Sequence, residues 1–536
     1  MNTLTAPQSE SPQGNGRLSP AGLLRRRAQQ TPYALALLDP PNRQEFAPSG
    51  PRRLSFGEAD TAVEALAAYF AHLGLAPGDC VAIQLPNLVE SPLTLLAAWR
   101  AGLTVAAVPM LWRATELARV CEMLEPAGLI GMSSYAGERP ASLLRDVAAT
   151  RLSIRFVMGF GPDLPDGVSS LDDAILDGPT PGFVPRANPG PALITFTARA
   201  GEPLVPVFRK QEDILLQGAM TVMALSLDRH DILLNPYPLT GPVGIAMGLA
   251  PWLIGGTALV QNDPFDADVF VQQLLTTGAT ATALPDTVLD RMAEDGIFSD
   301  PQCVLRHVGR VWSVPKLRER VATDVSPDRG GFDLYPLGDL ACLIETDKAA
   351  SKRGTLPAGV FQIADDEEVS AFLETRLVAG LKPDTKNIAV RGPLVPKRRP
   401  AEGAMGDAAT EDPNGFVKTG LFGETNGDRI RVSRDSELIY HGGFTIAASE
   451  LDGLYQAFLR FLDAACFTLP DPVLGDRIFA AVVPNPSMLV SLAELCDFLE
   501  ERSVASYKFP EKLLIVRSIP RDARGRIERD QILKQI

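Results

Sequence analysis

Histidine and cysteine are scarce in this chain, with four histidines and six cysteines among its 536 residues. The cysteines are far apart, and no two of them form a Cys-x-x-Cys pair. This spacing argues against a zinc site and is typical of free thiols in a reducing compartment. The N-terminus also lacks the basic and apolar regions of a secretory signal. We therefore expect a cytoplasmic protein.

Positive charge is outnumbered, because 51 Lys and Arg residues stand against 65 Asp and Glu residues, which gives a formal net charge of −14. Nucleic acids and anionic membrane surfaces bind proteins that present a basic face. The composition thus argues against a nucleic-acid partner, although an acidic balance alone identifies no other partner.

A long uninterrupted apolar run is missing as well. The segment from Val243 to Val260 carries no charge over 18 residues, but Pro251 and the pair Gly255-Gly256 interrupt it. A membrane-spanning helix needs about 20 predominantly apolar residues in one helix. We expect this segment to form a buried helix followed by a core strand, and we expect no membrane span.

What the sequence does contain is a regular alternation of helix and strand patterns. Residues 1–20 are rich in Ser, Pro, Gly, Asn and Gln and predict a disordered tail. After residue 54, apolar runs such as Cys80–Pro86 predict buried strands, and helical periodicity such as that of Ala59–Leu73 predicts helices. This alternation predicts an α/β fold with mostly parallel sheets.

The alternation runs through two rounds. We expect the second round to begin at the strand Ala192–Thr197, so that two related αβ subdomains follow one another in the chain. The pattern changes after Ser436, where strands and helices predict a smaller α+β unit. A chain of this length is sufficient for roughly two to four domains.

Several motifs occur in the order and spacing of one known family. The strongest is Ile519-Pro520-Arg521-Asp522-Ala523-Arg524-Gly525-Arg526-Ile527-Glu528-Arg529 near the C-terminus. Further matches are Asn235–Leu239, Ala283–Leu289, Gly415–Gly420, Leu438–Phe444, Pro470–Arg477 and Tyr507–Pro510. Over about residues 20–536, the chain resembles the AMP-forming acid–CoA ligases (acyl-CoA synthetases) of the adenylate-forming superfamily.

The resemblance implies an acetyl-CoA synthetase-like fold. A large N-terminal domain over residues 21–433 would contain two αβ subdomains and a β-barrel-like part. A hinge at residues 434–436 would connect it to a small, mobile α+β C-terminal domain over residues 437–536. In the family reaction, ATP and a carboxylic acid give an acyl adenylate, after which the C-terminal domain rotates and CoA accepts the acyl group.

The ligands that the resemblance implies are ATP or AMP with magnesium, CoA, and a small carboxylic acid or acyl-CoA. A homodimer is a candidate oligomeric state. The Ala-, Gly- and Leu-rich central segment indicates an apolar or aromatic acid and nothing more specific.

The phosphate loop of the family matches the segment after Thr197, where Gly201 and Pro203 fit the pattern. Small residues and hydroxyls let such a loop wrap phosphates, and a lysine supplies charge. Here the hydroxyls that follow Thr197 are gone, and Leu204 replaces the lysine. Two alternatives remain open: a working phosphate cradle or a closed structural turn.

Other nucleotide positions are partly retained. By resemblance, Tyr335 would stack on adenine, Asp339 would help to hold magnesium, and Arg434 would meet the ribose or phosphate. The family's ribose-binding Asp is Leu421, which cannot accept a hydrogen bond. Asp339 as an exposed turn residue and Arg434 as a surface ion-pair residue are the structural alternatives.

The C-terminal part of the chain contains further positions that resemble functional residues of the family. Arg526 stands where the family has its catalytic lysine, and Ser436 matches the pivot of the hinge. A guanidinium is a wide planar fork, whereas an ammonium is a compact point charge, so adenylation should suffer. Gly442 and Gly443 resemble the loop along the pantetheine tunnel, and Lys508 is a candidate for a CoA phosphate.

The alterations at the phosphate loop, Leu421 and Arg526 all affect ATP chemistry, and we expect none of them at a core-packing position. Two functional hypotheses follow. The first is an acyl-CoA synthetase-like protein that acts on or binds a carboxylic acid or acyl-CoA, with doubtful ATP-dependent adenylation. The alternative is a non-catalytic pseudoenzyme that binds an acyl ligand or a protein partner.

Overall fold

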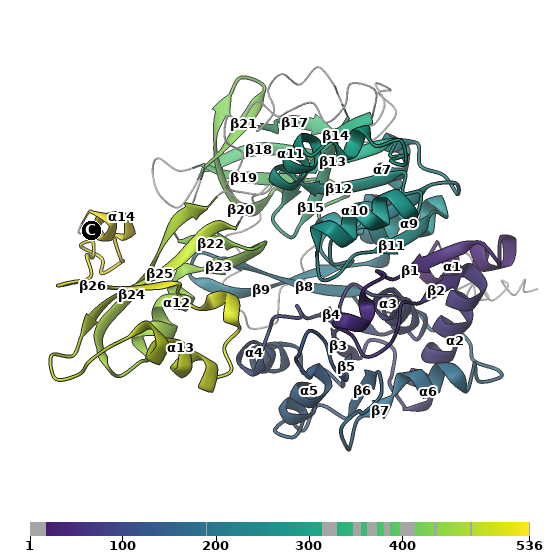
Figure 1. The fold of residues 1–536 in the computed structure, drawn as a ribbon, viewed down its shortest axis with the longest axis horizontal. Helices are drawn as coiled ribbons and strands as arrows, with labels where there is room; N and C mark the ends of the chain where they lie inside the picture. The colour runs from purple at the N-terminus through teal and green to yellow at the C-terminus, as the bar shows by residue number, and fades with distance from the viewer. Residues whose placement is uncertain are drawn as a thin grey trace, which may run out of the picture.

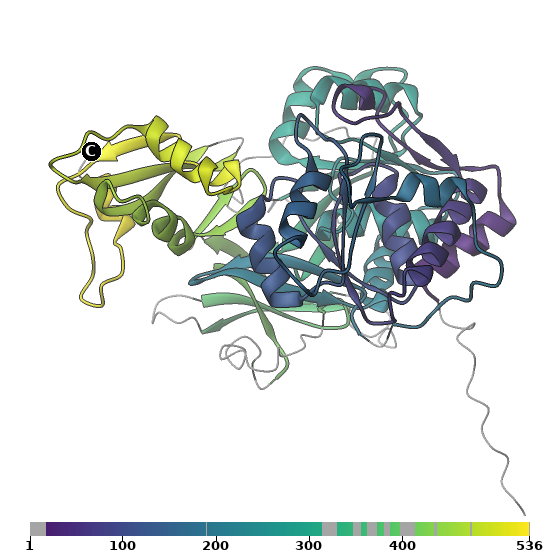
Figure 2. The same ribbon diagram turned by 90° about the horizontal axis from the view of Figure 1, so that it is seen from below.

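The computed structural model describes residues 18–188, 190–312, 330–346, 355–361, 372–379, 386–396, 412, 414–433, 437–471 and 474–534. Within these ranges, the strands form four sheets, three before residue 434 and one after residue 436 (Figures 1 and 2). Mixed α/β layers with a smaller C-terminal unit confirm the predicted fold class.

The first sheet has the strand order β7-β6-β5-β3-β4-β8-β9 and is parallel except at the β8–β9 edge. Its strands are β3 (Cys80–Gln84), β4 (Thr104–Ala107), β5 (Gly128–Met132), β6 (Phe156–Phe160), β7 (Ser169–Ser170), β8 (Leu193–Arg199) and β9 (Glu202–Arg209). The helices of this part of the chain are α1 (Pro20–Gln30), α2 (Phe56–His72), α3 (Glu90–Arg100), α4 (Ala114–Leu124), α5 (Pro140–Ala148) and α6 (Leu171–Leu176). β5 is buried along its whole length, as expected for a parallel strand that is covered on both faces.

The second sheet has the order β15-β14-β13-β12-β10-β11-β1-β2, with antiparallel strands only at its two edges. Its strands are β1 (Leu35–Leu38), β2 (Arg53–Ser55), β10 (Ile232–Asn235), β11 (Ala258–Gln261), β12 (Ala281–Pro285), β13 (His307–Val311), β14 (Gly330–Leu337) and β15 (Ala341–Glu345). The helices around it are α7 (Gln211–Leu225), α8 (Pro242–Gly244), the π-turn η2 (Ile245–Leu249), α9 (Ala250–Gly255), α10 (Ala267–Thr276) and α11 (Asp286–Glu294).

The uncharged segment of the second sheet is a buried helix followed by a core strand, as predicted. α8, η2 and α9 are continuous, and β11 follows them with all of its residues buried. Gly244 is required in this segment, because a Cβ atom there would lie 1.9 Å from the carbonyl oxygen of Pro238. Among the described residues, no helix is both long and apolar enough to cross a membrane.

The second series of alternating strands and helices does not form a separate sheet that begins with β8, as we expected. β8, which was expected to open the second subdomain, pairs with β4 of the first sheet, where Leu193 lies opposite Val105. The second sheet instead receives β1, where Leu37 lies opposite Leu259. The expectation is wrong because an apolar run predicts a buried strand but does not specify the parallel neighbour with which it pairs.

The third sheet is antiparallel and has the order β16-β21-β20-β19-β18-β17. Its strands are β16 (Leu356–Pro357), β17 (Gly359–Phe361), β18 (Leu373–Ala379), β19 (Lys386–Arg391), β20 (Val417–Asn426) and β21 (Arg429–Ser433). β16 and β17 stand at opposite ends of this order, yet only Ala358 separates them in the sequence. The sheet therefore curls until its edges approach each other, which agrees with the barrel-like part that was predicted.

The C-terminal unit has one five-stranded sheet within the described residues and its own apolar core. Its strands are β22 (Leu438–His441), β23 (Phe444–Ala447), β24 (Phe461–Asp471), β25 (Gly475–Pro484) and β26 (Lys512–Ile515), and its helices are α12 (Ala448–Gln456), α13 (Leu492–Glu501) and α14 (Arg529–Leu533). Ser491 and Glu494 form a capping box that starts α13. The domain boundaries and the mobility of this unit stay predictions, since the expected hinge residues 434–436 lie outside the described residues.

Asp263 connects the first two sheets at the carboxyl ends of their strands. It lies two residues after β11, and its Oδ2 accepts hydrogen bonds from the Asn87 N–H (2.8 Å) and from the Tyr135 hydroxyl (3.0 Å) of the first subdomain. Burial raises the pKa of Asp263 to about 6, although both hydrogen bonds oppose this shift. The carboxyl group is thus easier to protonate here than in the unfolded chain.

We predict that Asp263→Asn removes a pH-dependent loss of stability. Between about pH 4 and pH 6, the folded wild type retains a proton that the unfolded chain has released, so its free energy of unfolding falls as the pH rises through this window. The loss is at most about 3 kcal/mol, and Asn, which does not titrate, avoids it while still accepting hydrogen bonds. Urea denaturation of both proteins from pH 4 to pH 7 measures the difference, and a constant difference would contradict the prediction.

Candidate functional site

The segment where the resemblance places a phosphate loop is a tight β-hairpin. β8 continues past Thr197 to Arg199, which pairs with Glu202 of β9. Only Ala200 and Gly201 turn the chain, and Gly201 adopts a φ of 79°, a left-handed conformation that glycine tolerates without steric cost. Of the two alternatives that the sequence left open, the geometry is that of a closed structural turn.

β9 carries the remaining positions of this motif. Pro203 is exposed to solvent on this strand. Leu204, at the family's lysine position, packs against the apolar cluster that contains Trp112 and is joined by Phe196. The leucine therefore contributes packing where the family has a charge for phosphate.

Arg209 at the end of β9 is a site residue that the sequence analysis missed. Its side chain is buried, with 4% of the residue exposed, and donates to Thr195 Oγ1 (2.6 Å) and to the backbone carbonyl of Asp339. The Thr197 hydroxyl lies near enough to the Asp339 carboxyl group to lower its pKa. Two predicted residues, Thr197 and Asp339, are thus brought together beside a buried cation. The only sequence signal that could have indicated Arg209 is its position as a charged residue at the end of an alternating apolar strand pattern.

The charges of this cluster are strongly desolvated. Burial raises the pKa of Asp339, against the opposing effects of Arg209 and the Thr197 hydroxyl. Burial also lowers the pKa of Arg209, against the effects of Asp339 and Asp213. Each charge is costly to bury alone, and their proximity offsets part of that cost.

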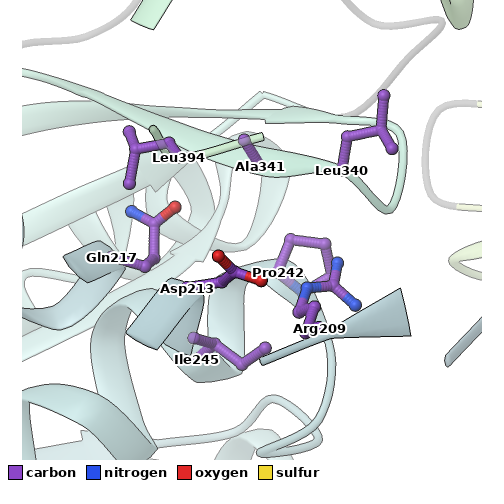
Figure 3. Close-up of a pocket in the computed structure, with 8 residues that line it drawn as sticks. All are labelled: Arg209, Asp213, Gln217, Pro242, Ile245, Leu340, Ala341 and Leu394. Atoms are coloured by element: carbon purple, nitrogen blue, oxygen red, sulfur yellow. The ribbon is translucent and has the colours of Figure 1, made fainter. Parts of the chain in front are cut away.

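A small cavity lies beside this cluster. Its volume is about 10 Å³, room for a single water molecule. Figure 3 shows Asp213 and Gln217 of α7 facing Leu340, Ala341 and Leu394 across it. A nucleotide needs far more space than this cavity offers.

Tyr335, the expected adenine-stacking residue, is enclosed in the core. It lies on β14 with 2% of its surface exposed, and its ring is stacked on Trp312 with centroids 6.5 Å apart and an interplanar angle of 10°. Its hydroxyl donates to Glu345 Oε2 (3.1 Å) and accepts from Arg429 Nη2 (3.3 Å). Burial raises the pKa of this phenol. An adenine ring can reach Tyr335 only if this packing is displaced.

Leu421, at the position of the family's ribose-binding Asp, is also a core residue. It is 6% exposed and belongs to the same apolar cluster as Tyr335. The Thr419 carbonyl oxygen lies 2.7 Å from the place of a Cβ atom on Gly338, so the two nucleotide motifs lie directly against each other. Our expectation that this position is not core-packing is wrong, because the curled third sheet buries this part of β20 against β14.

Arg526 is engaged within its own turn. Its Nε donates to Asp522 Oδ2 (2.8 Å), its backbone N–H donates to Asp522 Oδ1 (2.9 Å), and a bridge between Arg521 and Ile527 closes the turn. The Arg526 backbone N–H and then its guanidinium lower the pKa of Asp522. Helix α14, which follows this turn, lies at the outer end of the molecule, far from β14 and β15 (Figure 1). The structure does not bring Arg526 to Asp339, and Arg434 and Ser436 lie outside the described residues.

The residues expected near CoA lie on the inner side of the C-terminal unit. Gly442 and Gly443 form the exposed turn between β22 and β23, with φ values of 56° and 88°. Lys508 is 3% exposed, and its Nζ binds Glu116 (2.8 Å) and Glu450 (3.0 Å). In this structure its ammonium is bound to two carboxylates.

Tyr237 follows β10 in the central segment that resembles the family. Its hydroxyl is buried and has no hydrogen-bond partner among the described residues. Burial raises its pKa well above the usual value, and Cys342 and Asp286 reinforce this shift. Tyr237 and Asp286 belong to two of the segments that resemble the family, and they lie close enough for Asp286 to affect the pKa of Tyr237.

Magnesium and nucleotide do not fit the residues that the structure describes. Asp339 offers one carboxylate, and the buried cation of Arg209 already lies beside it. Among the described residues, no group of three or more His, Cys, Asp or Glu side chains is arranged to hold a metal ion. The stacking ring and the ribose position are filled by core packing, and the phosphate loop is a hairpin.

Comparisons with known proteins agree with the resemblance. The family model of AMP-binding enzymes matches residues 24–198. The salicyl-AMP ligase / salicyl-S-ArCP synthetase of Mycobacterium tuberculosis is 28% identical over 92% of this chain and 88% of its own length. The 2-hydroxy-7-methoxy-5-methyl-1-naphthoate–CoA ligase of Streptomyces carzinostaticus is 27% identical over 94% of this chain and 90% of its own length.

Solved structures show the same fold. A double mutant of o-succinylbenzoate CoA synthetase (MenE) from Bacillus subtilis superposes with a TM-score of 0.76 at 19% identity, covering 96% of this chain and 98% of that protein. MbtA of Mycobacterium smegmatis gives a TM-score of 0.63 at 24% identity, with 98% and 96% covered. Over most of its length the chain is therefore similar to adenylate-forming acid–CoA ligases, and it is an acyl-CoA synthetase-like protein.

Proposed function

We propose that the protein binds a carboxylic acid as its CoA thioester and that ATP-dependent formation of the acyl adenylate is strongly reduced. The observation that carries this proposal is the joint burial of Tyr335 and Leu421 in one apolar cluster. Adenine and ribose would both have to enter space that this cluster occupies.

ATP bound at these positions would leave several of its polar groups without partners. Ribose hydroxyls placed against Leu421 would lose their acceptor, which costs about 1–3 kcal/mol. The hairpin at Gly201 leaves no loop to wrap a phosphate, and Arg209 donates to the backbone carbonyl of Asp339, the residue that resembles the family's magnesium ligand. These effects act on three different parts of ATP, so they weaken its binding together.

One feature near the acyl-pocket segment of the family supports the acyl part of this proposal. Tyr237 presents a buried, neutral hydroxyl in an otherwise apolar segment, and such a donor suits the carbonyl of an acyl group. Relatives that are named for salicylate, a hydroxylated naphthoate and 2,3-dihydroxybenzoate act on aromatic acids. We therefore assign an aromatic acid as the acyl class.

A complete acid–CoA ligase is the second candidate, and it is favoured by the names of the relatives. MenE and the naphthoate ligase join an acid to CoA. For this candidate, the Tyr335 and Leu421 cluster would have to open on binding ATP.

The ligand response separates these two candidates. We expect an aromatic acyl-CoA at 100 times its Kd to stabilise the protein by about 2.7 kcal/mol, and ATP with magnesium to leave the melting temperature unchanged. Thermal-shift titrations with ATP–magnesium, AMP, CoA, benzoyl-CoA and salicyl-CoA measure this. A shift with ATP or AMP, together with pyrophosphate release, would establish the complete ligase instead.

Leu421→Asp tests whether the ribose position can be restored. We expect the variant to lose about 3–5 kcal/mol of stability, because an uncompensated carboxylate enters a core beside Tyr335. Combined with Arg526→Lys, it should still release no pyrophosphate. Arg526→Lys alone is the matched control, and at an exposed position it should change stability by less than about 0.5 kcal/mol. A gain of pyrophosphate release in the pair would show an impaired but living adenylation site.

Tyr237→Phe tests the acyl side. Because the hydroxyl has no partner among the described residues, its removal should leave the melting temperature unchanged or slightly higher. Affinity for an aromatic acyl-CoA should fall by about tenfold, equivalent to one lost hydrogen bond of about 1.4 kcal/mol. Thermal denaturation measures the melting temperature and isothermal titration measures the affinity, and Tyr69→Phe on α2 is the control that should change neither. Equal affinity of the variant and the wild type would remove Tyr237 from the site.

A further inference from the structure

The C-terminal unit is fixed to the large domain by a buried group of charges. Lys508 Nζ lies 2.8 Å from Glu116 Oε1 of α4 and 3.0 Å from Glu450 Oε1 of α12. The exposed fractions of these three side chains are only 4%, 4% and 5%. Arg119 of α4 pairs with Glu450 as well. Two cations and two carboxylates therefore neutralise one another across the interface, and loss of one partner leaves a buried charge uncompensated.

Backbone hydrogen bonds surround this group. Thr115 at the start of α4 donates through Oγ1 to the Arg502 carbonyl (2.7 Å) and through its N–H to the Ser503 carbonyl (3.3 Å). The Ala505 N–H donates to Glu116 Oε1 (3.3 Å). The end of α13 and the segment after it are thereby placed against the first turn of α4.

Aromatic rings continue the interface toward the hairpin. Trp112 Nε1 donates to the Tyr507 hydroxyl (3.1 Å), and the Tyr507 ring is stacked on Phe444 of β23 with centroids 4.2 Å apart. On the other side, Trp112 packs on Phe196 of β8. Leu204 of β9 and Tyr507 pack against the same apolar cluster. The substitution that removed the phosphate lysine thus added packing beside the C-terminal unit.

We propose that these contacts form an interdomain clamp that holds the C-terminal unit with β23 against the β8–β9 hairpin and with Arg526 away from Asp339. We define the clamp as Trp112, Glu116, Arg119, Glu450, Tyr507 and Lys508. In Figure 1, β23 lies beside β8 and β9, and α14 lies at the opposite side of the unit. The clamp favours one of the two orientations that the family reaction needs, and it works against rotation toward adenylation.

The inference rests on the proposed function in one respect, because the clamped orientation is taken as the one that serves acyl-CoA. Its physical basis is independent, since it depends only on the contacts between α4, the hairpin and residues 502–508. An experiment can therefore separate the two.

A disulfide across the interface reports the clamped orientation. Thr115→Cys with Ser503→Cys places two thiols where the backbones already share a hydrogen bond, and a mild oxidant removes two electrons and two protons to form the S–S bond. We expect this cross-link to form at least tenfold faster than in a chain that also carries Lys508→Met. An equal rate in both chains, or no cross-link in the double-cysteine chain, would overturn the clamp.

Two further variants keep this test interpretable. Glu116→Gln removes the negative charge, while the single amide oxygen of Gln can still accept from the Arg113 N–H and keep the capping box of α4. Glu116→Gln should also slow cross-linking, and it replaces Lys508→Met in the test if that variant fails to fold. Arg521→Met breaks the exposed pair of Arg521 with Asp463 in the same unit, away from α4, and should leave the rate unchanged.

The oxidised, cross-linked chain then reports on function. We expect it to keep its thermal-shift response to benzoyl-CoA or salicyl-CoA within twofold in Kd, because the clamped orientation is already the binding one. Loss of a response that the reduced chain shows would overturn the assignment of this orientation. If neither form responds while cross-linking still depends on Lys508, the clamp stands and the proposed acyl-CoA function fails.

Discussion

The antiparallel pairing of β8 with β9 is the constraint on which the rest of the structure depends. Because Arg199 pairs with Glu202, the chain returns after a two-residue turn and has no loop left to wrap a phosphate. The same pairing ends the first sheet and directs Arg209 toward the carbonyl of Asp339. It also presents Leu204 and Phe196 on the side where the C-terminal unit packs. One hairpin thus decides the phosphate position, the charge at the metal position and the interface between the domains.

Buried charge in this protein is handled by pairing, and the location of each pair has a consequence. Arg209 donates to the backbone carbonyl of Asp339, and its positive charge opposes the burial that raises the pKa of this carboxyl group. Lys508 between Glu116 and Glu450 connects two domains that the family moves apart. Buried ion pairs contribute little net stability compared with apolar packing, but breaking one side is costly. Such pairs therefore specify an arrangement more than they strengthen it.

The residues at the nucleotide positions are packed in the core, whereas Tyr237 keeps a hydroxyl that can pair with a ligand. Tyr335 and Leu421 became core residues once the third sheet curled against β14, and core packing leaves no space for a ligand. Tyr237 kept a polar atom in a buried place without a partner among the described residues. A buried polar atom of this kind is uncommon in folded proteins, and a ligand is one way in which it becomes paired. The proposed acyl-CoA function depends on this contrast.

The sequence by itself determined the elements, the family and the altered chemistry. Apolar runs and periodicity located the strand within Cys80–Pro86 and the helix over Ala59–Leu73, because burial on a strand or a helix face requires those local patterns. Motif spacing identified the family, and Leu421 and Arg526 were recognisable as replacements. Only the tertiary structure decided which strands pair, so that β8 joined the first sheet and β1 joined the second. The tertiary structure alone buried Leu421, placed Arg209 beside Asp339 and bound Lys508 to α4. These contacts join segments that are far apart in the chain. No local sequence pattern records which distant surface a side chain will contact.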